Sequence, residues 1–486
     1  MASGDGIVPY GVACFARLDG WQDRPLLANG PRALSAQQIA RQAASIAQYL
    51  RDAGVQEGDV GLICLRDPID TILAFLAHWY LGASPLVLDF RLRQFRASGA
   101  RIALVDPRAP GRDLMSTLAF SPDMLHGPAP RDGPTMSRVA AAAPAMMLAS
   151  SGTTGSPKIY AVDFHVMKAW GAAREVDLPL PQGLALCALP LQYVASLMLV
   201  LRNLLEGLPV RFHPVLSGHS EITEALLQHP VVHTALPPSV IRRMAAEVGP
   251  RDVPLLNHVQ SLRSSGGPAL PDDKIAAFHN LSNGYNMSFG SGLSGFVSLL
   301  AGQDVLERPE TSGRIHAATP VEIIGPDGHA VPAGESGALR IHTRTLSRIV
   351  ASDQSTSELL GDGWCMTGDV AMVDGDGFLT ILGRSSDMIL RGGVSISATE
   401  LEAVIAALDG VREVAVIGVD DPDLGQEVGA VVVAPGLEFQ ALRRHCVEQI
   451  SPDKRPRRFA LVDSLPYSAN GKLLRRNIDA AIFGSG

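Results

Sequence analysis

The spacing of apolar residues predicts a helix at residues 36–53, near the start of the chain. Its apolar side chains recur at the intervals of one helix face, at Ile39, Ala43, Ile46 and Leu50. Ser35 precedes this segment as a residue type that caps helix N-termini, and Gly54 follows it where a glycine commonly ends a helix. Together these signals indicate an amphipathic helix that packs one face against a core.

Short apolar runs alternate with helical segments in the same part of the chain. Residues 59–65 have the composition of a strand, residues 73–80 indicate a helix, and residues 85–89 form a second strand-like run. A further apolar run at residues 145–148 indicates a buried strand. Alternation of strands and helices predicts an α/β fold with mostly parallel sheets.

The composition is that of a globular protein long enough for two or more domains. The chain has 486 residues, of which 46% are hydrophobic and 19% are charged, and its formal net charge is −8. This negative charge gives no electrostatic basis for binding nucleic acid or an anionic membrane surface. The longest apolar stretch, residues 72–88, is interrupted by His78, Gly82 and Pro85, so we expect a core helix and a strand rather than a membrane span.

The cysteines and the N-terminal residues lead us to expect a cytoplasmic protein. Five cysteines are scattered without paired spacing, which argues against a zinc site and against a disulfide framework. The first residues lack a basic region followed by an apolar core, so we expect no secretory signal. A reducing, cytoplasmic location is the resulting expectation.

The segment directly after the apolar run 145–148 has the composition of an anion-binding loop. Hydroxyl groups, two glycines and a lysine fall within nine positions: Ser150, Ser151, Gly152, Thr153, Thr154, Gly155, Ser156, Pro157 and Lys158. Glycine lets backbone N–H groups converge on an anion, and the hydroxyls and the ammonium of Lys158 add donors suited to phosphate. The order differs from the Walker pattern, in which the lysine directly follows a glycine. Because a polar turn between two strands has a similar composition, the interpretation needs support from the rest of the chain.

This loop resembles the phosphate loop of the adenylate-forming superfamily, which comprises acyl-CoA synthetases, firefly-luciferase-like enzymes and peptide-synthetase adenylation domains. Two further segments resemble that family's adenine site, where a flat base needs exposed backbone without a Cβ. The turn beneath the adenine corresponds to Gly266, Gly267 and Pro268. The aromatic-glycine step that covers the other face of the base corresponds to Phe289 and Gly290, and Ser291 follows as a possible phosphate contact.

The chain departs from the family directly after this step. The family has a threonine and a magnesium-binding glutamate where this chain has Gly292 and Leu293, and a leucine side chain cannot coordinate Mg²⁺. The resemblance implies ATP and Mg²⁺ as cofactors, but the protein ligand of the metal is unknown. Magnesium usually keeps several waters and relies on substrate phosphates, so the loss of one carboxylate need not abolish its binding.

Two charged residues resemble the family's ribose contacts. Asp369 has two acceptor oxygens that suit both ribose hydroxyls, and Arg384 is the second contact. Two residues further on, Ser386 takes the place of the family's hinge. The resemblance therefore implies a large N-terminal AMP-binding domain of βα subdomains at residues 1–383 and a small mobile α+β domain at residues 384–486.

The remaining motifs concern the catalytic lysine, the thiol and the acid. Lys472, in an Asn-Gly-Lys turn, resembles the lysine that bridges the substrate carboxylate and the α-phosphate, where negative charge accumulates. The segment implied to border the CoA channel is Arg391, Gly392 and Gly393. The residues implied to line the acyl pocket are Gln192, Tyr193, Val194 and Ser196. Because this stretch has no aspartate to hold an amino group, we expect an aryl or short-to-medium acyl acid rather than an amino acid.

The ordered series of motifs implies an enzyme that joins a carboxylic acid to ATP and then to a thiol. Acyl-AMP and pyrophosphate form first, and the acyl group then passes to the thiol of CoA, the expected acceptor. One alternative is a stand-alone adenylation enzyme that loads a carrier-protein thiol. Another is a nucleotide-binding subunit without turnover, which Gly292 and Leu293 motivate. We expect no nucleic-acid or membrane partner.

Overall fold

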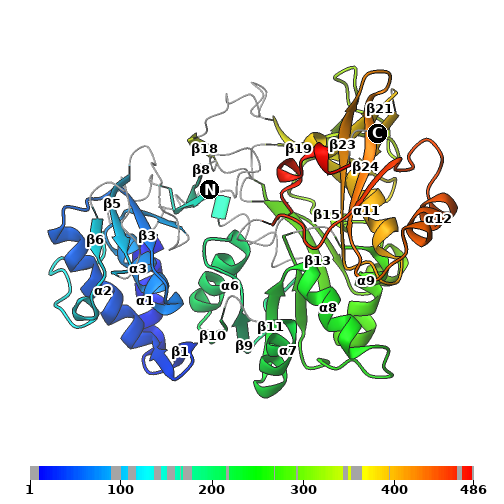
Figure 1. Ribbon diagram of the computed structural model, residues 1–486. Helices are drawn as coiled ribbons and strands as arrows, with labels where there is room; N and C mark the ends of the chain where they lie inside the picture. Colours follow the sequence, from blue (N-terminus) through cyan, green and yellow to red (C-terminus); the bar gives the residue numbers. More distant parts are fainter. Residues whose placement is uncertain are drawn as a thin grey trace. The chain divides into compact units, whose positions relative to one another are not determined.

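The computed structural model describes residues 10–88, 100–107, 117–135, 144–149, 159–164, 166–167, 178–214, 218–266, 269–291, 294–342, 348–351, 364–392, 394–467 and 473–483. The chain divides into two compact units, each built around its own sheets (Figure 1). The first unit comprises residues 1–320 and 342–357, and the second comprises residues 321–341 and 358–486. These units do not coincide with the division at residues 383 and 384, which stays a prediction.

The elements predicted from the apolar pattern are present in the first unit. Helix α2 (Ala36–Asp52) begins with a capping box, in which the Ser35 hydroxyl accepts a hydrogen bond from the backbone N–H of Gln38. Gly54 follows the helix in the left-handed conformation, with φ of 94°. The predicted strands are β3 (Val60–Cys64), β4 (Ser84–Val87) and β7 (Met146–Ala149).

The second predicted helix is longer than its apolar pattern indicated. Helix α3 (Pro68–Tyr80) begins five residues before the expected start at residue 73. Asp67 caps it by accepting a hydrogen bond from the backbone N–H of Asp70, and Pro68 stands at the first helical position. Proline is favoured there because its missing N–H would have no helical partner. Cap chemistry, rather than periodicity, therefore sets this boundary.

A nine-stranded mixed sheet forms one part of the first unit. Its strands, in spatial order, are β15 (Arg314–Ile315), β14 (Gly295–Ala301), β13 (Tyr285–Ser291), β12 (Ser261–Ser264), β11 (Val231–Leu236), β9 (Leu184–Cys187), β10 (Val210–Phe212), β1 (Pro25–Asn29) and β2 (Arg32–Ser35). Strands β13, β12, β11, β9, β10 and β1 run parallel to one another, whereas β14 and β2 are antiparallel to β13 and β1. The carboxyl ends of the parallel strands therefore lie along one edge of the sheet.

Helices of the first unit pack against this nine-stranded sheet and against the seven-stranded sheet that is described next. Helices α7 (His219–Gln228), α8 (Pro238–Val248) and α9 (Pro271–Ala276) belong to the layer beside β11, β12 and β13, and α6 (Val194–Leu205) contacts β9, β10 and β11 (Figure 1). Helix α1 (Tyr10–Trp21) packs on α2, and the short helix α10 (Asp304–Glu307) follows β14.

A seven-stranded sheet forms the other part of the first unit. Its spatial order is β18 (Arg348–Ala351), β8 (Ile159–Val162), β7, β4, β3, β5 (Ala100–Val105) and β6 (Thr117–Ala119). Strands β7, β4, β3, β5 and β6 are parallel to one another, and β8 is antiparallel to β7. The predicted α/β fold with mostly parallel sheets is confirmed.

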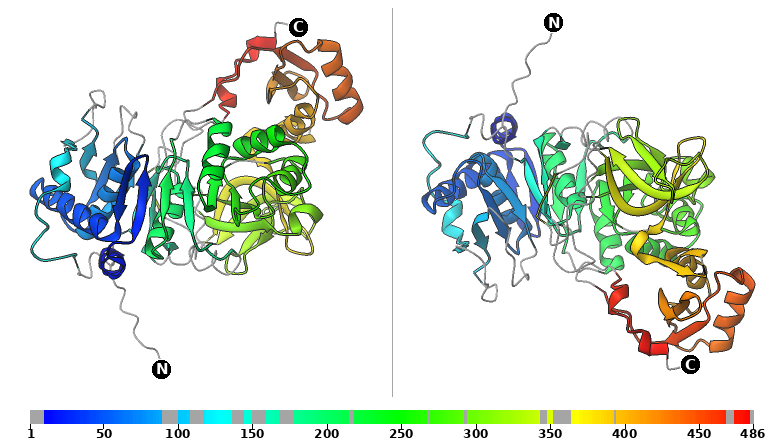
Figure 2. Two further views of the ribbon diagram at one scale, coloured as in Figure 1. Left: turned by 90° about the horizontal axis from the view of Figure 1, so that it is seen from below. Right: turned by 90° about the horizontal axis from the view of Figure 1, so that it is seen from above.

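The second unit contains two smaller sheets. The first has the order β16 (Val321–Ile324), β17 (Ser336–His342), β19 (Trp364–Val373) and β20 (Leu379–Arg384). The second has the order β22 (Val394–Ser397), β21 (Met388–Arg391), β24 (Gly425–Val433) and β23 (Glu413–Asp421), with β25 (Arg458–Leu461) parallel to β24. Helices α11 (Ala398–Ala406) and α12 (Phe439–Gln449) pack on this sheet through a shared apolar core. Figure 2 shows these C-terminal elements, coloured orange to red, lying together in both views.

The apolar runs at residues 411–419 and 427–433 fall within or next to β23 and β24. None of the helices in the ranges given above is long and apolar enough to cross a membrane.

Candidate active site

The predicted acyl and adenine residues of the first unit lie along one edge of the nine-stranded sheet. Gln192 follows β9, Gly266 follows β12, and Phe289 is near the end of β13. These three strands belong to the parallel part of the sheet. In open α/β sheets, ligands bind outside the carboxyl ends of parallel strands. The topology therefore brings the predicted acyl pocket and the predicted adenine contacts to the expected edge.

Gly266 has a backbone that favours glycine and open space beside it. Its φ is 97°, in the left-handed region, and a Cβ added to it would meet no heavy atom within 4 Å. Its neighbour Ser265 donates a backbone hydrogen bond to the carbonyl of Leu236, which ties this turn to β11. The turn thus presents bare backbone at the sheet edge, as a flat base requires.

Gly290 is required by a neighbouring strand. A Cβ at this position would lie 1.8 Å from the carbonyl oxygen of Gly295 in β14, so no larger residue fits without moving the backbone. The pairing of β13 with β14 shifts register between Phe289 and Gly290, and such a bulge re-aims nearby side chains. Phe289 is half-buried. The role of both residues at the adenine stays a prediction.

The four predicted acyl-pocket residues form the start of α6. Tyr193 is the N-cap residue, and Gln192, Tyr193 and Val194 are half-buried. Ser196 is buried, and its hydroxyl donates to the backbone carbonyls of Pro190 and Tyr193. Ser196 therefore fixes the turn into the helix, and any contact with an acyl group would compete with these bonds. The first three residues are better placed to line a pocket.

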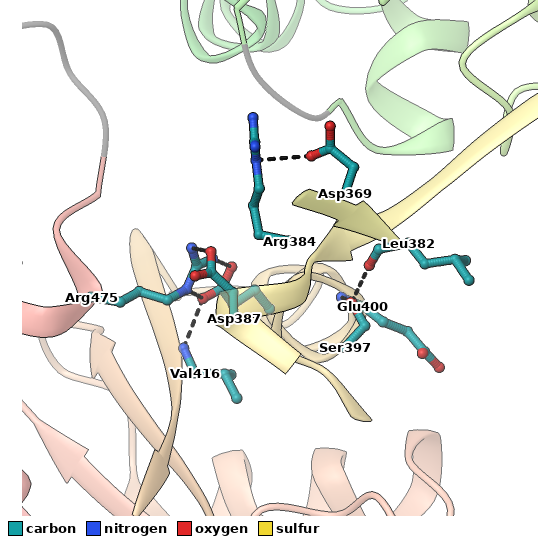
Figure 3. A network of polar contacts seen from close by, with 9 residues as sticks. Asp369, Leu382, Arg384, Asp387, Ser397, Glu400, Val416 and Arg475 are labelled. Carbon is teal, nitrogen blue, oxygen red and sulfur yellow. Dashed lines mark hydrogen bonds and ion pairs between the residues drawn. The ribbon is translucent and has the colours of Figure 1, made fainter. Parts of the chain in front are cut away.

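Asp369 and Arg384 face each other across two antiparallel strands of the second unit. They are directly opposed in the pairing of β19 with β20, and Arg384 Nε lies 2.8 Å from Asp369 Oδ1 (Figure 3). The side chain of Asp369 is 8% exposed and that of Arg384 is 54% exposed. Arg384 Nη1 also donates to the backbone carbonyl of Thr367, at 3.0 Å. The two predicted ribose contacts thus form one cluster, fifteen positions apart in the sequence.

The Thr-Gly-Asp turn holds the carboxylate in a partly desolvated position. The Asp369 N–H donates to the Thr367 hydroxyl at 3.1 Å, and Gly368 adopts a φ of 77°. Burial raises the pKa of Asp369 above its ordinary value, and the nearby Arg384 opposes that rise. A carboxylate desolvated in this way is stabilised by hydroxyl groups that donate hydrogen bonds to it, and the two hydroxyls of a ribose can donate such bonds.

The predicted CoA segment begins with an arginine that is already paired. Arg391 Nε lies 2.8 Å from Glu427 Oε1, and Arg391 Nη1 donates to the backbone carbonyl of Asp453 at 2.8 Å. Both side chains of the pair are about one-tenth exposed or less. Gly392 follows with a φ of 55°, and a Cβ there would lie 3.3 Å from the side chain of Leu424. Arg391 therefore anchors the turn, and its contribution to a CoA channel stays a prediction.

Sequence reasoning missed Arg475, which links three segments of the second unit. Its guanidinium donates to Glu402 of α11, with Nε 3.1 Å from Oε1, and Nη1 lies 3.0 Å from Asp387 Oδ2 (Figure 3). Glu402 also accepts from the backbone N–H of Val416 at 2.8 Å. Burial raises the pKa of Glu402, and Arg475 opposes that rise. The only sequence signal was a pair of arginines just after Lys472.

The structure brackets the position of the predicted catalytic lysine without describing it. Tyr467 and Leu473 pair through an isolated antiparallel bridge, and the Leu474 N–H donates to the Pro466 carbonyl at 2.8 Å. Arg475 follows in a short 3₁₀ helix, Arg475–Asn477. The predicted hinge residue Ser386 lies in another such helix, Ser385–Asp387.

Several predicted site residues lie outside the described residues: Ser150, Ser151, Gly152, Thr153, Thr154, Gly155, Lys158, Gly267, Pro268, Gly292, Leu293, Gly393 and Lys472. For Ser291 the structure describes the backbone only. The phosphate-loop segment is framed by the antiparallel pair β7 and β8, in which Ala149 pairs with Ile159. Within the part of the chain that is described, no group of three or more His, Cys, Asp or Glu side chains could hold a metal ion.

Comparison with known proteins gives the same family for most of the chain. Residues 14–349 match the family model of AMP-binding enzymes, and residues 400–472 match that of the AMP-binding enzyme C-terminal domain. The 2-succinylbenzoate–CoA ligase of Geobacillus kaustophilus is 28% identical, with 95% of each chain covered. The feruloyl-CoA synthase of an Amycolatopsis species is 30% identical, with 93% of this chain and 94% of that one covered.

A solved structure has the same fold. O-succinylbenzoate coenzyme A synthetase (MenE) from Bacillus subtilis, in complex with AMP, superimposes with a TM-score of 0.86 at 21% identity, over 97% of this chain and 99% of that one. The same enzyme in complex with ATP and a magnesium ion gives a TM-score of 0.83 at 22% identity, over 96% and 98% of the two chains. The chain therefore belongs to the AMP-binding enzymes of the adenylate-forming superfamily, in the branch of the acyl-CoA synthetases.

Proposed function

We propose that this chain is an AMP-forming ligase that activates a small carboxylic acid with ATP and transfers the acyl group to CoA. The observation that carries the proposal is the pair formed by Asp369 and Arg384. A buried carboxylate beside a half-exposed guanidinium offers acceptors for a vicinal diol and a positive charge within reach of a phosphate. Family membership and the CoA-ligase activity named for its relatives support the same reaction.

In the first half-reaction, a carboxylate oxygen of the acid attacks the α-phosphorus of ATP and pyrophosphate leaves. Asp369 and Arg384 hold the ribose, while Gly266 and Phe289 enclose the adenine. We assign Thr153, Thr154 and Lys158 to the β- and γ-phosphates. Lys472 stabilises the negative charge that gathers between the carboxylate and the α-phosphate. All eight roles are part of the proposal and follow from the resemblance, and Thr153, Thr154, Lys158 and Lys472 also lie outside the described part of the chain.

In the second half-reaction, a thiol sulfur attacks the acyl carbonyl carbon and AMP leaves with the bonding electrons. We propose that the domain at residues 384–486 turns about Ser386 between the two steps. That motion would withdraw Lys472 and bring the segment from Arg391 to Gly393 beside the thiol. Separating the two steps keeps water from the reactive adenylate.

Neither the described residues nor the position of Leu293 offers a set of side-chain ligands for magnesium, so the ion would bind mainly through the phosphates of ATP. Leu293 stands where the family has its metal-binding glutamate, and the described residues contain no cluster of metal-ligating side chains. When bound with ATP, magnesium would neutralise phosphate charge, held by phosphate oxygens and water.

The first test is pyrophosphate release from ATP over a panel of acids, with and without CoA. The panel should include 2-succinylbenzoate, ferulate and fatty acids, because these are the kinds of acid named for relatives. Acid-dependent release that rises with CoA, with formation of the acyl-CoA, supports the proposal. Release that is independent of CoA, with transfer to a carrier-protein thiol, would favour the stand-alone adenylation enzyme.

The hypothesis of a nucleotide-binding subunit without turnover has its own outcome. If ATP binds and no acid gives pyrophosphate release, the presence of Gly292 and Leu293 is the first explanation to test. Restoring the family residues, by Gly292→Thr with Leu293→Glu, should then recover release.

The catalytic assignment is tested by Lys472→Ala. We expect it to abolish adenylate formation while ATP binding survives, because the lysine acts on charge that develops in the transition state. Adenylation near the wild-type rate would show that another residue takes this role.

A further inference from the structure

The two faces of the nine-stranded sheet differ in polarity near β11, β12 and β13. On one face, Leu236, Leu262, Tyr285 and Met287 join the apolar core beneath α8. Successive side chains of a strand point to opposite faces, so Arg263, next to Leu262, and Asn286, between Tyr285 and Met287, point to the other one. The buried polar side chains of this second face are His233, Ser261, Arg263 and Asn286.

Arg263 is the charged member of this group, and it has no acidic partner among the residues that the structure describes. It is 4% exposed, and its Nε donates to Asn286 Oδ1 at 3.3 Å. Within the described ranges this is its only hydrogen bond, and no carboxylate there is close enough to influence its pKa. Burial lowers that pKa to about 9, so the guanidinium is still charged at neutral pH.

The neighbours of Arg263 hold one edge of the guanidinium in place. Asn286 Nδ2 donates to Ser261 Oγ at 3.1 Å and to the carbonyl of Gly284 at 3.0 Å, which fixes its carboxamide oxygen toward Arg263. This arrangement pre-organises the cation and leaves its remaining donors for another acceptor. Ala235 lies opposite Arg263 on β11 and, with a single methyl group, occupies little of the space beside it.

The surroundings add positive charge and an unsatisfied polar atom. Burial, with a smaller effect of Arg202 of α6, lowers the pKa of the His233 imidazole to about 4, and Arg202 itself lies near the carboxylate of Glu206. His233 Nδ1 is buried and has no hydrogen-bond partner among the described residues. A buried cation without a counter-charge costs several kcal/mol, and the described residues supply none to Arg263, so this face is complementary to an anion.

The cluster lies below the edge where the acid is expected to react. Arg263 precedes Gly266 by three residues on β12, and Asn286 precedes Phe289 by three residues on β13. At about 3.3 Å per residue, the backbone of Arg263 is roughly 10 Å from that edge. Helix α6, whose first turn carries the predicted acyl residues, contacts β9 and β11 beside this face.

We propose that Arg263 binds a second anionic group of the acid, so that the chain activates dicarboxylic acids in preference to monocarboxylic ones. This inference rests on the proposed function. One carboxylate is adenylated at the sheet edge, and the other stays ionised against the guanidinium, with Asn286 orienting the arginine and His233 adding a neutral imidazole. Arg263 is then the specificity-determining residue of the acyl pocket.

Matched pairs of acids test the preference without any variant. Pyrophosphate release is compared for succinate with butyrate, adipate with hexanoate, and 4-carboxybenzoate with benzoate. We expect kcat/KM for the dicarboxylic member of at least one pair to be higher by about 100-fold, because a site built around a polar group rejects the analogue that lacks it. Turnover of the monocarboxylic acids with equal or higher kcat/KM would overturn this inference and leave the proposed function standing. Pyrophosphate release that does not depend on any added acid would instead refute the proposed function.

Two variants locate the preference. Arg263→Met should lower the ratio of dicarboxylic to monocarboxylic kcat/KM by about 30-fold or more, as expected for removing one partner of a buried charge pair. Asn286→Asp, which is nearly the same shape, supplies an internal counter-ion and should lower the same ratio while raising the melting temperature. If Arg263→Met does not fold, the ratio of dicarboxylic to monocarboxylic kcat/KM in Asn286→Asp tests the proposal. A ratio unchanged in the folded variants would overturn the proposal.

Discussion

The second unit contains two arginine–carboxylate pairs with the same contact distance and opposite surroundings. Arg384 Nε and Asp369 Oδ1 are 2.8 Å apart, as are Arg391 Nε and Glu427 Oε1. In the first pair the arginine is 54% exposed over an 8% exposed carboxylate. In the second pair the side chains are 10% and 9% exposed. The contact distance therefore does not distinguish the pair that we propose to bind the ribose from the fully buried pair, whereas the exposure of the arginine does.

The physical reason is the availability of the partners. Arg384 is half-exposed and can be solvated when it moves away from Asp369, so breaking this pair leaves one buried charge rather than two, and a ligand hydroxyl that donates to Asp369 can replace the arginine. Asp369 can thus exchange its partner for a ligand. Arg391 and Glu427 are both buried, so separating them leaves two unpaired buried charges, and a second contact of Arg391, to the carbonyl of Asp453, adds to that restraint. The first pair is suited to binding and the second to holding a turn in place.

The largest effect is expected from breaking the buried pair. Glu427→Gln should lower the free energy of unfolding by about 3 kcal/mol, because it leaves the Arg391 guanidinium buried without a counter-charge. Urea denaturation of the purified variant measures the loss. A double variant, Arg391→Met with Glu427→Leu, should recover most of the stability, since no buried charge remains. A loss below about 1 kcal/mol in the single variant would show that this buried pair contributes no more to stability than an exposed ion pair does.

Removing the carboxylate of the other pair should affect binding instead. Asp369→Asn is expected to weaken adenosine binding by about 2 kcal/mol, roughly 30-fold, because a charged acceptor for the ribose hydroxyls is lost. Stability should be unchanged or slightly higher, since burial already disfavours this carboxylate. Isothermal titration with adenosine and a thermal melt give the two readouts. Unchanged affinity together with a lower melting temperature would assign Asp369 a structural role.

The ion pairs of Arg475 are intermediate in burial between the two pairs above. Its side chain is 22% exposed, and those of its partners Glu402 and Asp387 are 13% and 30% exposed. Arg475→Met should therefore cost about 1.5 kcal/mol in stability, less than the fully buried pair. It should also slow adenylation more than it weakens ATP binding, because Lys472 lies three residues before it.

The matched control for that variant is Arg457→Met, at an exposed position of the same unit. The control should leave both stability and rate within experimental error of wild type. Equal effects of the two variants on the rate would show that Arg475 does not position the lysine segment.

The smallest expected effect is a pH dependence of nucleoside binding. Burial raises the pKa of Asp369 above its ordinary value of about 4, so protonation begins at a higher pH than for an exposed aspartate. As the pH falls through that raised pKa, the carboxylate loses an acceptor and adenosine binding should weaken by about 1 kcal/mol. Adenosine is the probe because it carries no phosphate that titrates in the same range. A profile that is equally steep in Asp369→Asn would assign the pH dependence to another group.

Local chemistry was enough to predict much of this protein. The helix at residues 36–52 and the strands β3, β4 and β7 follow from apolar spacing and capping residues within a few positions of one another. The order of short motifs, from the loop at residues 150–158 to Asp369 and Arg384, indicated the family that the comparisons then showed. Such signals survive in the sequence because each depends on neighbours along the chain.

Burial and partners between distant segments required the tertiary structure. Gly290 must be glycine because the Gly295 carbonyl of the adjacent strand occupies the place of its Cβ. Arg475 reaches Glu402 across 73 positions, and no local pattern encodes that distance. Arg263 lies in the short strand Ser261–Ser264, whose sequence does not distinguish it from a surface arginine, and only the folded sheet shows that it is buried. The sequence by itself determined the family and the local elements, whereas packing alone decided which charges are paired, buried or open to a ligand, because desolvation depends on everything around a group.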